Sequence, residues 1–404
     1  MEFDRLLSVW WQPKAPDREY TGQISRDPDG ATAIELAGTL TGSLFPMHDP
    51  EPELLHGLGK KGPLFTSRRL TRSGAGMGMP GFATEVLRPF SLIVGAHVDE
   101  ETIYDQALLQ ATFLSDWLQE SGIQIQVRPG TDAQKGSAAV SYQWPTARTS
   151  EIAPDATVAT WTSHKGEPRR SGYAINEDVA LKISLGAAIP VDDLIRDYVT
   201  PLLDLVSFGT RRSNAVDRVT LRSPWVTRVV DGKSEREDLE FLTEWIAKPV
   251  QNPERPLPHH MNFAVGDAPM GFDELVRRWF TLYQDLRPCL APYFGLVYAP
   301  PSYVDLRLVS ISQVLEAYHR ASKLPGGAMS KEEFAKFKKA LLDACPAPQK
   351  EFLEKKLGYL NELSQVERNK PATRSCQGRA PPSPTNPAEL FRRLHRCTQC
   401  QNAP

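Results

Sequence analysis

The hydrophobic pattern changes once along the chain, and this change constrains the fold more than any other feature. In the first half, short apolar and β-branched runs are separated by clusters of Gly, Pro, Asp and Ser. Two of these runs flank the sequence DPDG at residues 27–30, which has Pro and Gly where a tight turn requires them. A succession of such runs predicts a sandwich or a barrel.

Two segments of the first half carry helical periodicity instead. Residues 103–122, IYDQALLQATFLSDWLQESG, predict one helix from their apolar spacing. The apolar stripe consists of Ala107, Leu109, Phe113, Leu114, Trp117 and Leu118. A second helix is expected to start near Val191, with a kink or break at Pro201 because proline lacks an amide donor. We assign residues 1–225 to this β-rich domain.

The second half has the pattern of amphipathic helices. The sequence DELVRRWFTLYQDLRP has one apolar face, and we expect its helix to stop at Pro288. A second helix follows in SYVDLRLVSISQVLEAYHR, and its predicted buried face contains Val304, Leu308, Ile311, Leu315 and Tyr318. Ser330 and Glu333 form a capping box for a third. Helices that each bury one face predict a bundle, which we place at residues 263–366.

Two segments without periodicity flank the predicted bundle. NPERPLPHH at 252–260 contains three prolines, and we predict a Pro-rich linker region over residues 226–262. From residue 367 onward the chain has seven Lys or Arg against two Glu, together with six prolines. This composition cannot bury a core, so residues 367–404 are predicted to form a disordered basic tail.

Composition limits the class of protein. Among 404 residues, 41% are hydrophobic and the formal net charge is −2, so any nucleic-acid contact must use a local basic surface. Five cysteines, an odd count, form no disulfide framework and indicate a reducing compartment. The most apolar long stretch, residues 289–301, contains three prolines and is too short to span a bilayer. We therefore predict a cytoplasmic protein with no membrane partner.

The order of segments carries a family resemblance. GQISRDPDGATAIELAGTL, HGLGKKGPLFTSRRL and RPFSLIVGAHV follow one another and precede FLSDWL. This order resembles the N-terminal domain of the ApeA family of bacterial anti-phage proteins. VRRWFTLYQDLRP and the later LEAYHR, which contains Glu316 and His319, resemble the HEPN domain that follows in such proteins. The implied fold class is α+β: a sandwich- or barrel-like β-rich domain, then an α-helical HEPN-like bundle that is truncated.

The resemblance implies RNA cleavage without a cofactor. HEPN ribonucleases carry an Arg and, four to six residues later, a His on a late helix, and two protomers bring these pairs together. A His of near-neutral pKa can move the proton of a ribose 2′-OH, and Arg can stabilise the charged transition state. No such pair follows Leu363. The single match, Arg255 and His260, lies among prolines before the helical half, where a helix cannot hold it.

Two functional hypotheses therefore stay open. In the first, the chain is a defence protein with a sensing or binding N-terminal domain and a helical effector or dimerisation half that lacks a recognisable catalytic motif. In the second, it is an active HEPN ribonuclease. The expected partners are RNA, a phage-derived trigger and a second copy bound through the helical half. Glu316 and His319 are expected to be structural residues of the bundle or of its interface.

Three other groups of residues are candidate sites. Arg68, Arg69 and Arg72 form the densest local basic patch, which fits either a phosphate contact or a solvated strand end. Cys397 and Cys400 supply two of the four ligands of a zinc site, too few for a metal prediction, and lie where the resemblance calls for the catalytic helix. MHDPEPELLH, ending at His56, fits a metal loop or an exposed loop.

Overall fold

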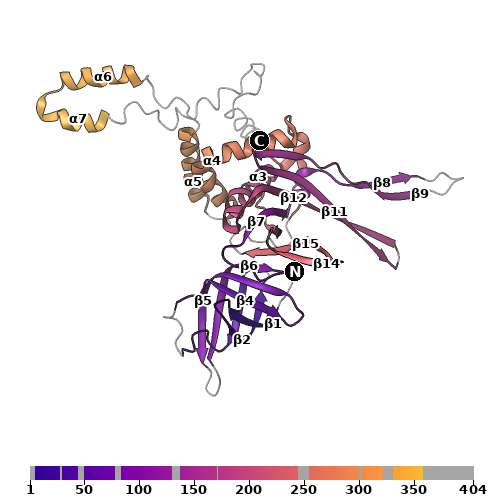
Figure 1. Ribbon diagram of the computed structural model, residues 1–404. Coiled ribbons are helices and arrows are strands. Elements are labelled where there is room, and N and C mark those ends of the chain that lie inside the picture. The colour runs from indigo at the N-terminus through magenta and orange to yellow at the C-terminus, as the bar shows by residue number, and fades with distance from the viewer. Residues whose placement is uncertain are drawn as a thin grey trace. The chain divides into compact units, whose positions relative to one another are not determined.

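A computed structural model describes residues 5–27, 30–43, 50–77, 83–129, 137–170, 172–243, 254–299, 303–321 and 331–357. The chain divides into two compact units, Met1–Phe280 and Thr281–Pro404, and each is described by itself. Every described strand lies in the first unit (Figure 1). None of the helices in the described ranges is long and apolar enough to cross a membrane.

Six antiparallel strands at the start of the chain close into a barrel (Figure 1). They are β1 (Leu6–Gln12), β2 (Ala15–Arg26), β3 (Thr32–Ala37), β4 (Leu54–Gly59), β5 (Leu64–Met77) and β6 (Ala83–Val94). Their order is β6-β3-β2-β1-β4-β5, and pairing between β5 and β6 completes the ring. The predicted turn at residues 27–30 connects β2 to β3, and Arg26 pairs with Thr32 across it. The barrel alternative of the predicted fold is thus confirmed.

The barrel interior holds an apolar cluster centred on Trp10. The Trp10 ring stacks on Phe65 at a centroid distance of 5.8 Å, and its indole N–H donates to the Ser8 hydroxyl at 2.7 Å. Gly57 lies opposite Trp10 on β4, where a Cβ atom would approach the ring to 2.5 Å. Leucine and isoleucine side chains from all around the barrel complete the cluster. Because closure removes both sheet edges, every strand of the barrel can bury one face around the Trp10 side chain.

The sheet continues beyond the barrel because β6 is long. Its first half pairs with β3, and its second half pairs with β16 (Leu239–Thr243). From β16 an open antiparallel sheet runs through five further strands. In spatial order these are β13 (Val216–Arg222), β7 (Ile103–Ala111), β12 (Gly172–Pro190), β11 (Ala156–Arg169) and β10 (Thr149–Ala153).

One face of the open sheet is covered by helices. The helical segments are α1 (Leu114–Leu118), α2 (Val191–Leu194), a π-helical turn (Ile195–Val199) and α3 (Thr200–Thr210). α1 and α2 contact β12, α2 also contacts β7, and α1 packs on α3. Trp279 stacks on Phe208 at 6.0 Å and donates its indole N–H to the Pro201 carbonyl at 2.7 Å. The first part of α4 (Gly271–Tyr298) therefore belongs to this helical layer.

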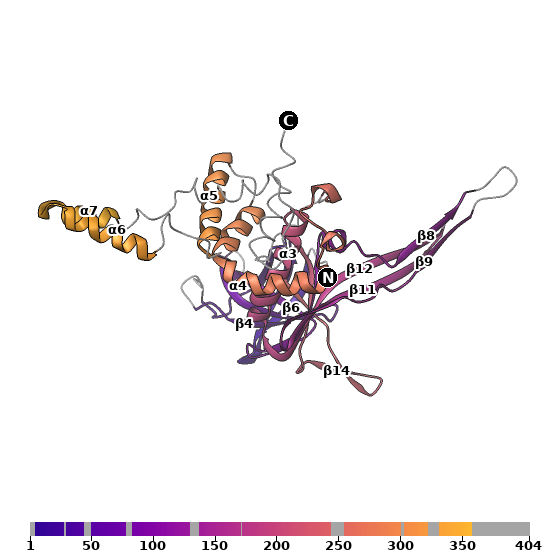
Figure 2. The ribbon, with the colours of Figure 1, turned by 90° about the horizontal axis from the view of Figure 1, so that it is seen from above.

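Two hairpins form separate two-stranded sheets. They are β8 (Ile123–Arg128) with β9 (Ser137–Tyr142), and β14 (Thr227–Val230) with β15 (Lys233–Arg236). The β8–β9 hairpin projects away from the sheet (Figure 2), and its base contacts the β11–β12 hairpin where Tyr142 stacks on His164. Ile125 pairs with Val140, and both side chains are more than half exposed. The hairpin therefore has an apolar face that the described residues leave open to solvent.

The second unit is helical. It holds the rest of α4, followed by α5 (Val304–Ala321), α6 (Lys331–Ala344) and α7 (Lys350–Leu357). Short 3-10 turns occur at Pro258–His260 and Val265–Asp267 in the first unit and at Ala347–Gln349 in the second. A C-terminal helical region is thus confirmed, while its HEPN-like character stays a prediction.

Several predicted elements need correction. Only residues 114–118 of the predicted helix at 103–122 are helical, because Ala107, Leu109 and Ala111 bury one face of strand β7. The helix expected to stop at Pro288 continues to Tyr298, since buried residues recur at helical spacing after the proline. These buried residues are Cys289, Leu290 and Phe294.

The sequence predicts a kink or a break at Pro201; the helical path continues without a break, through a π-helical turn that ends just before α3, and the kink stays a prediction. Proline has no amide N–H to donate to the preceding turn, and the change to π-helical hydrogen bonding just before α3 coincides with that missing donor.

Two further predictions differ from the structure. Strands β14, β15 and β16 lie within residues 226–262, the range predicted to be a linker, because β13 and β6 hold β16 in the sheet. The predicted buried face of α5 is open to solvent at Val304, which is 71% exposed, and at Leu308, which is 57% exposed. The spacing of apolar residues correctly identified an apolar face of α5, but it could not show whether another part of the protein covers that face.

Candidate ligand-binding trough

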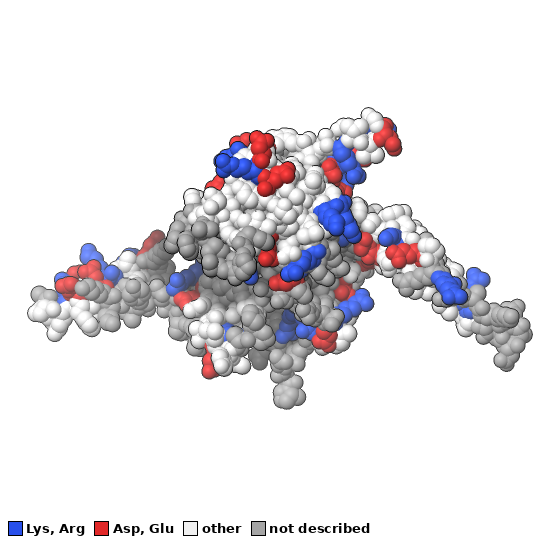
Figure 3. Space-filling model, turned by 90° about the horizontal axis from the view of Figure 1, so that it is seen from below, with Lys and Arg blue, Asp and Glu red and all other residues white. Residues whose placement is uncertain are grey.

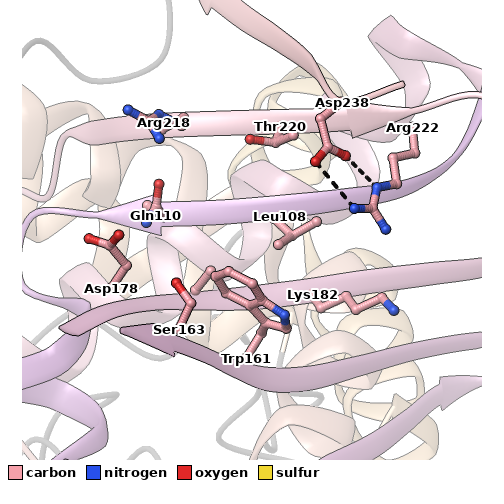
Figure 4. A pocket seen from close by; sticks show the side chains of 11 residues that line it. Leu108, Gln110, Trp161, Ser163, Asp178, Lys182, Arg218, Thr220, Arg222 and Asp238 are labelled. Atoms are coloured by element: carbon pink, nitrogen blue, oxygen red, sulfur yellow. Dashed lines mark hydrogen bonds and ion pairs between the residues drawn. The ribbon is translucent and has the colours of Figure 1, made fainter. Parts of the chain in front are cut away.

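The open sheet is hollowed on the face turned away from its helices, and we call this hollow the sheet trough (Figure 4). Its residues come from β7, β11, β12, β13 and the residue before β16. They are Leu108, Gln110, Trp161, Ser163, Asp178, Ala180, Lys182, Arg218, Thr220, Arg222 and Asp238. All of them lie in the first compact unit.

Strand alternation places these side chains on one face. On β7, Ala107 and Leu109 are fully buried, so Leu108 between them and Gln110 after them point to the opposite side. On β13, buried Val219 and Leu221 alternate with Arg218, Thr220 and Arg222 in the same way. Polar and charged residues can occupy the trough because the sheet needs only its other face for the core.

An aromatic and aliphatic floor lies at the middle of the trough. Trp161 on β11 is 38% exposed and stands opposite the fully buried Ala180 on β12, so part of the indole faces solvent. Leu108 on β7 pairs with both Lys182 and Thr220 on its neighbouring strands. In Figure 4 the Trp161 and Leu108 side chains lie between the two polar ends of the trough.

The two ends of the trough differ in charge. Lys182, Arg222 and Asp238 gather at one end, where two dashed lines join the Arg222 guanidinium to the Asp238 carboxylate (Figure 4). This ion pair raises the pKa of Arg222. No ion pair holds Lys182 within the described part of the chain. The other end carries Gln110, Ser163, Asp178 and Arg218, whose Nε lies 3.9 Å from a Glu240 carboxylate oxygen.

The hollow continues from the Asp178 end toward Glu177 and Thr112. Glu177 accepts hydrogen bonds from the Gly122 amide at 2.7 Å and from the Tyr142 hydroxyl at 3.0 Å. Burial of the Tyr142 hydroxyl, its hydrogen bond to Glu177 and the negative charge of Glu177 raise the pKa of Tyr142 to about 12. Glu177 therefore fixes the base of the β8–β9 hairpin beside the trough.

The three predicted phosphate-contacting arginines have partners inside the protein. Arg68 and Arg69 reach Asp192 at 3.4 and 2.8 Å, and the Arg69 guanidinium lies 3.9 Å from the centroid of the Phe90 ring. Arg72 is buried and pairs with Glu85 at 2.5 Å. Of the three, only Arg69 has a half-exposed side chain. The phosphate contact stays a prediction, and it now depends on that residue.

The Arg255–His260 match does not lie on a helix. Arg255 forms an ion pair with Asp116, and His260 is exposed in the 3-10 turn Pro258–His260. In α5, Glu316 pairs with Arg320 at 2.7 Å. The His319 side chain, Cys397, Cys400 and the predicted tail at 367–404 lie outside the described residues. The proposed roles of these groups therefore stay predictions.

His56 belongs to an aromatic cluster on the barrel. Its ring stacks on His97 at a centroid distance of 4.6 Å, and Trp11 meets the His97 ring edge-on at 5.0 Å. Burial lowers the pKa of His56, against the hydrogen bond between its Nε2 and the Val98 carbonyl at 3.1 Å. Within the described ranges, no three His, Cys, Asp or Glu side chains form a metal-binding group. His48 and Asp49, the other residues of the suggested metal loop, are outside those ranges.

The trough residues were missed at the sequence level. They are single residues spread over five segments, and register alone brings them together. Two features of the sequence could nevertheless have pointed to the trough. RVTLR, at 218–222, alternates basic or polar residues with apolar ones, and Trp161 lies in a run of small and β-branched residues. Side-by-side pairing of these strands could not be read from the sequence.

The barrel, the open sheet and the trough together define the class as a β-rich N-terminal domain with a mixed-polarity hollow, followed by a helical region. The sequence matches the family ApeA N-terminal domain 1 over residues 6–279, which is more than half of the chain, and the chain belongs to this family. Membership of this family suggests a general role in anti-phage defence. No curated protein and no solved structure matches the chain.

Proposed function

We propose that the chain is an anti-phage defence protein whose β-rich domain binds a phage-derived trigger in the sheet trough. The observation that carries this proposal is the exposed indole of Trp161 between two polar ends of a hollow. Exposed aromatic residues in concave sites are frequent anchors for ligands. The family match supports the defence role, because ApeA proteins are the class to which this domain belongs.

The helical half is proposed to act as an HEPN-type effector or dimerisation region. The exposed apolar residues of α5, among them Val304, Leu308 and Ile311, support a dimerisation role, since burying them against a second copy removes apolar surface from water. RNA cleavage is left out of the proposal. Among the described residues, the only Arg–His string of suitable spacing is Arg255 to His260, which lies in a turn.

Phage challenge tests the proposal. Bacteria that express the chain are plated with a panel of phages, and efficiency of plating is compared with that of cells carrying an empty vector. We expect fewer plaques with the wild type, and loss of protection with Trp161→Ala. Trp225→Ala is the matched control, because Trp225 is 60% exposed in the same unit but does not line the trough. Immunoblots check that all three proteins accumulate equally.

Two results would contradict the proposal. The first is equal plating on expressing and empty-vector cells for every phage of the panel. The second is full protection by Trp161→Ala, which would show that trigger binding does not depend on the trough.

A further inference from the structure

We infer that the sheet trough binds an unpaired nucleotide, with the base on Trp161 and the phosphate at Lys182. This inference rests on the proposed function, because it names the ligand class of the same site. Three features of the trough point to a nucleotide: a partly exposed indole, an available cation at one end, and hydrogen-bonding groups at the other.

The indole provides a stacking surface. Trp161 lies on the open face of the sheet and is 38% exposed, and its cross-strand neighbour Ala180 is too small to shield the exposed part of the ring. Every nucleobase has a flat π-face that stacks on aromatic side chains in single-stranded recognition. The Leu108 side chain beside the ring extends this floor with apolar surface (Figure 4).

The phosphate end is defined by Lys182. Lys182 lies on β12 two residues after Ala180, the cross-strand partner of Trp161, and so points to the same face of the sheet. One strand spacing of about 4.8 Å and a two-residue rise of about 7 Å separate Lys182 from Trp161, a span that a nucleotide with its base on Trp161 can bridge to its phosphate. Arg222 points to the same end but is already held by Asp238, so Lys182 is the more available cation.

The opposite end suits the edge of a base. Gln110 offers amide donors and an acceptor, Ser163 a hydroxyl, and Asp178 a carboxylate that accepts from exocyclic amino groups. Arg218 also lies at this end, but the Asp178 carboxylate and Glu240, 3.9 Å from the Arg218 Nε, oppose a second phosphate there. The trough therefore suits one nucleotide rather than the regularly spaced phosphates of a duplex.

The surface charge agrees with this choice of ligand. On the face shown in Figure 3, Lys and Arg side chains are interspersed with Asp and Glu. Double-stranded nucleic acid is bound mainly through arrays of phosphate contacts, which require a continuous basic surface. A stacked base with a single phosphate contact requires no such array.

Fluorescence anisotropy with the full chain tests the inference. The probes are 5′-fluorescein-labelled 12-nucleotide RNA and DNA homopolymers, a labelled 12-base-pair duplex, and unlabelled nucleoside monophosphates as competitors. We expect binding of single strands, and a loss of about tenfold or more in affinity for Trp161→Ala and for Lys182→Glu. Trp225→Ala and Lys233→Glu are matched controls on exposed residues outside the trough, and we expect wild-type affinity from both.

Competition separates the two sources of a nucleotide. Displacement by free monophosphates at concentrations close to those of the oligomer indicates a free nucleotide, whereas displacement only by oligomers indicates a single strand. Either result supports the inference. Four results would overturn it: no binding of any probe by folded protein, affinities unchanged in both trough variants, tighter binding of the duplex, or a trough occupied by a peptide in a crosslinking experiment.

The binding assay and the phage assay test separate claims, so either claim can be refuted without the other. Nucleotide binding that depends on Trp161, combined with full phage protection by Trp161→Ala, would uphold the ligand class and contradict the proposed function. Trough-dependent protection without nucleotide binding would do the reverse.

Discussion

The buried ion pair inside the barrel provides the sharpest test of the fold. The Arg72 and Glu85 side chains are 3% and 0% exposed, and their charged groups meet at 2.5 Å. The second Glu85 oxygen accepts the Leu40 amide N–H at 2.8 Å. We predict that Arg72→Met strongly destabilises the barrel, because the Glu85 carboxylate then stays buried with no cation beside it.

The magnitude follows from desolvation. Removing one partner of a buried pair costs about 3–5 kcal/mol, because the remaining charge has lost water and gained nothing in return. Domains are stable by about 5–15 kcal/mol in total, so Arg72→Met is expected to remove a large share of that stability. The double variant Arg72→Met/Glu85→Gln has no buried charge, and the carbonyl of the introduced amide can still accept from the Leu40 N–H. We expect it to cost about 2 kcal/mol less than the Arg72 variant alone.

Urea unfolding followed by tryptophan fluorescence measures these costs. Arg236→Met is the matched control, since Arg236 pairs with Asp105 at 2.7 Å but its side chain is 40% exposed. That control should cost about 1 kcal/mol or less. Two outcomes would refute this account: a cost for Arg72→Met as small as that of Arg236→Met, or single-variant costs that add without coupling in the double variant.

Two further predictions concern the barrel. Burial lowers the pKa of His56 in the folded state, with His97 and Asp99 as its charged neighbours. The unfolded chain therefore binds this proton first, and stability should fall as pH drops below about 6.5 toward the folded pKa. Urea unfolding at pH 7.5 and 5.5 should show this fall, and His56→Gln should reduce it; an unchanged fall would exclude His56 as its source. Gly57→Ala should cost about 1–3 kcal/mol, because its Cβ would meet the Trp10 ring, whereas Gly74→Ala has 3.8 Å to its nearest side-chain atom and should cost less. Equal costs in thermal denaturation would contradict this packing.

Local pattern identified most strands of the barrel but failed at β7 in the open sheet. In residues 103–111 the buried positions 107, 109 and 111 are two apart, as on a strand, yet the run joins smoothly to the helix α1 that follows. A short apolar run fits both periods, and only pairing with β12 and β13 selects the strand. The same dependence on partners explains β16, whose range the sequence assigned to a linker.

The sequence by itself determined the division into a β-rich and a helical part, because side-chain periodicity is a local property. It also identified the family, whose signal is the order of those segments. Tertiary structure alone decided where charged residues lie. Pairing of β5 with β6 in the barrel buried Arg72 against Glu85, and the register of β11, β12, β7 and β13 placed Trp161, Lys182 and Arg222 around one hollow. Contacts between distant segments set burial and charge pairing, and no local pattern encodes them.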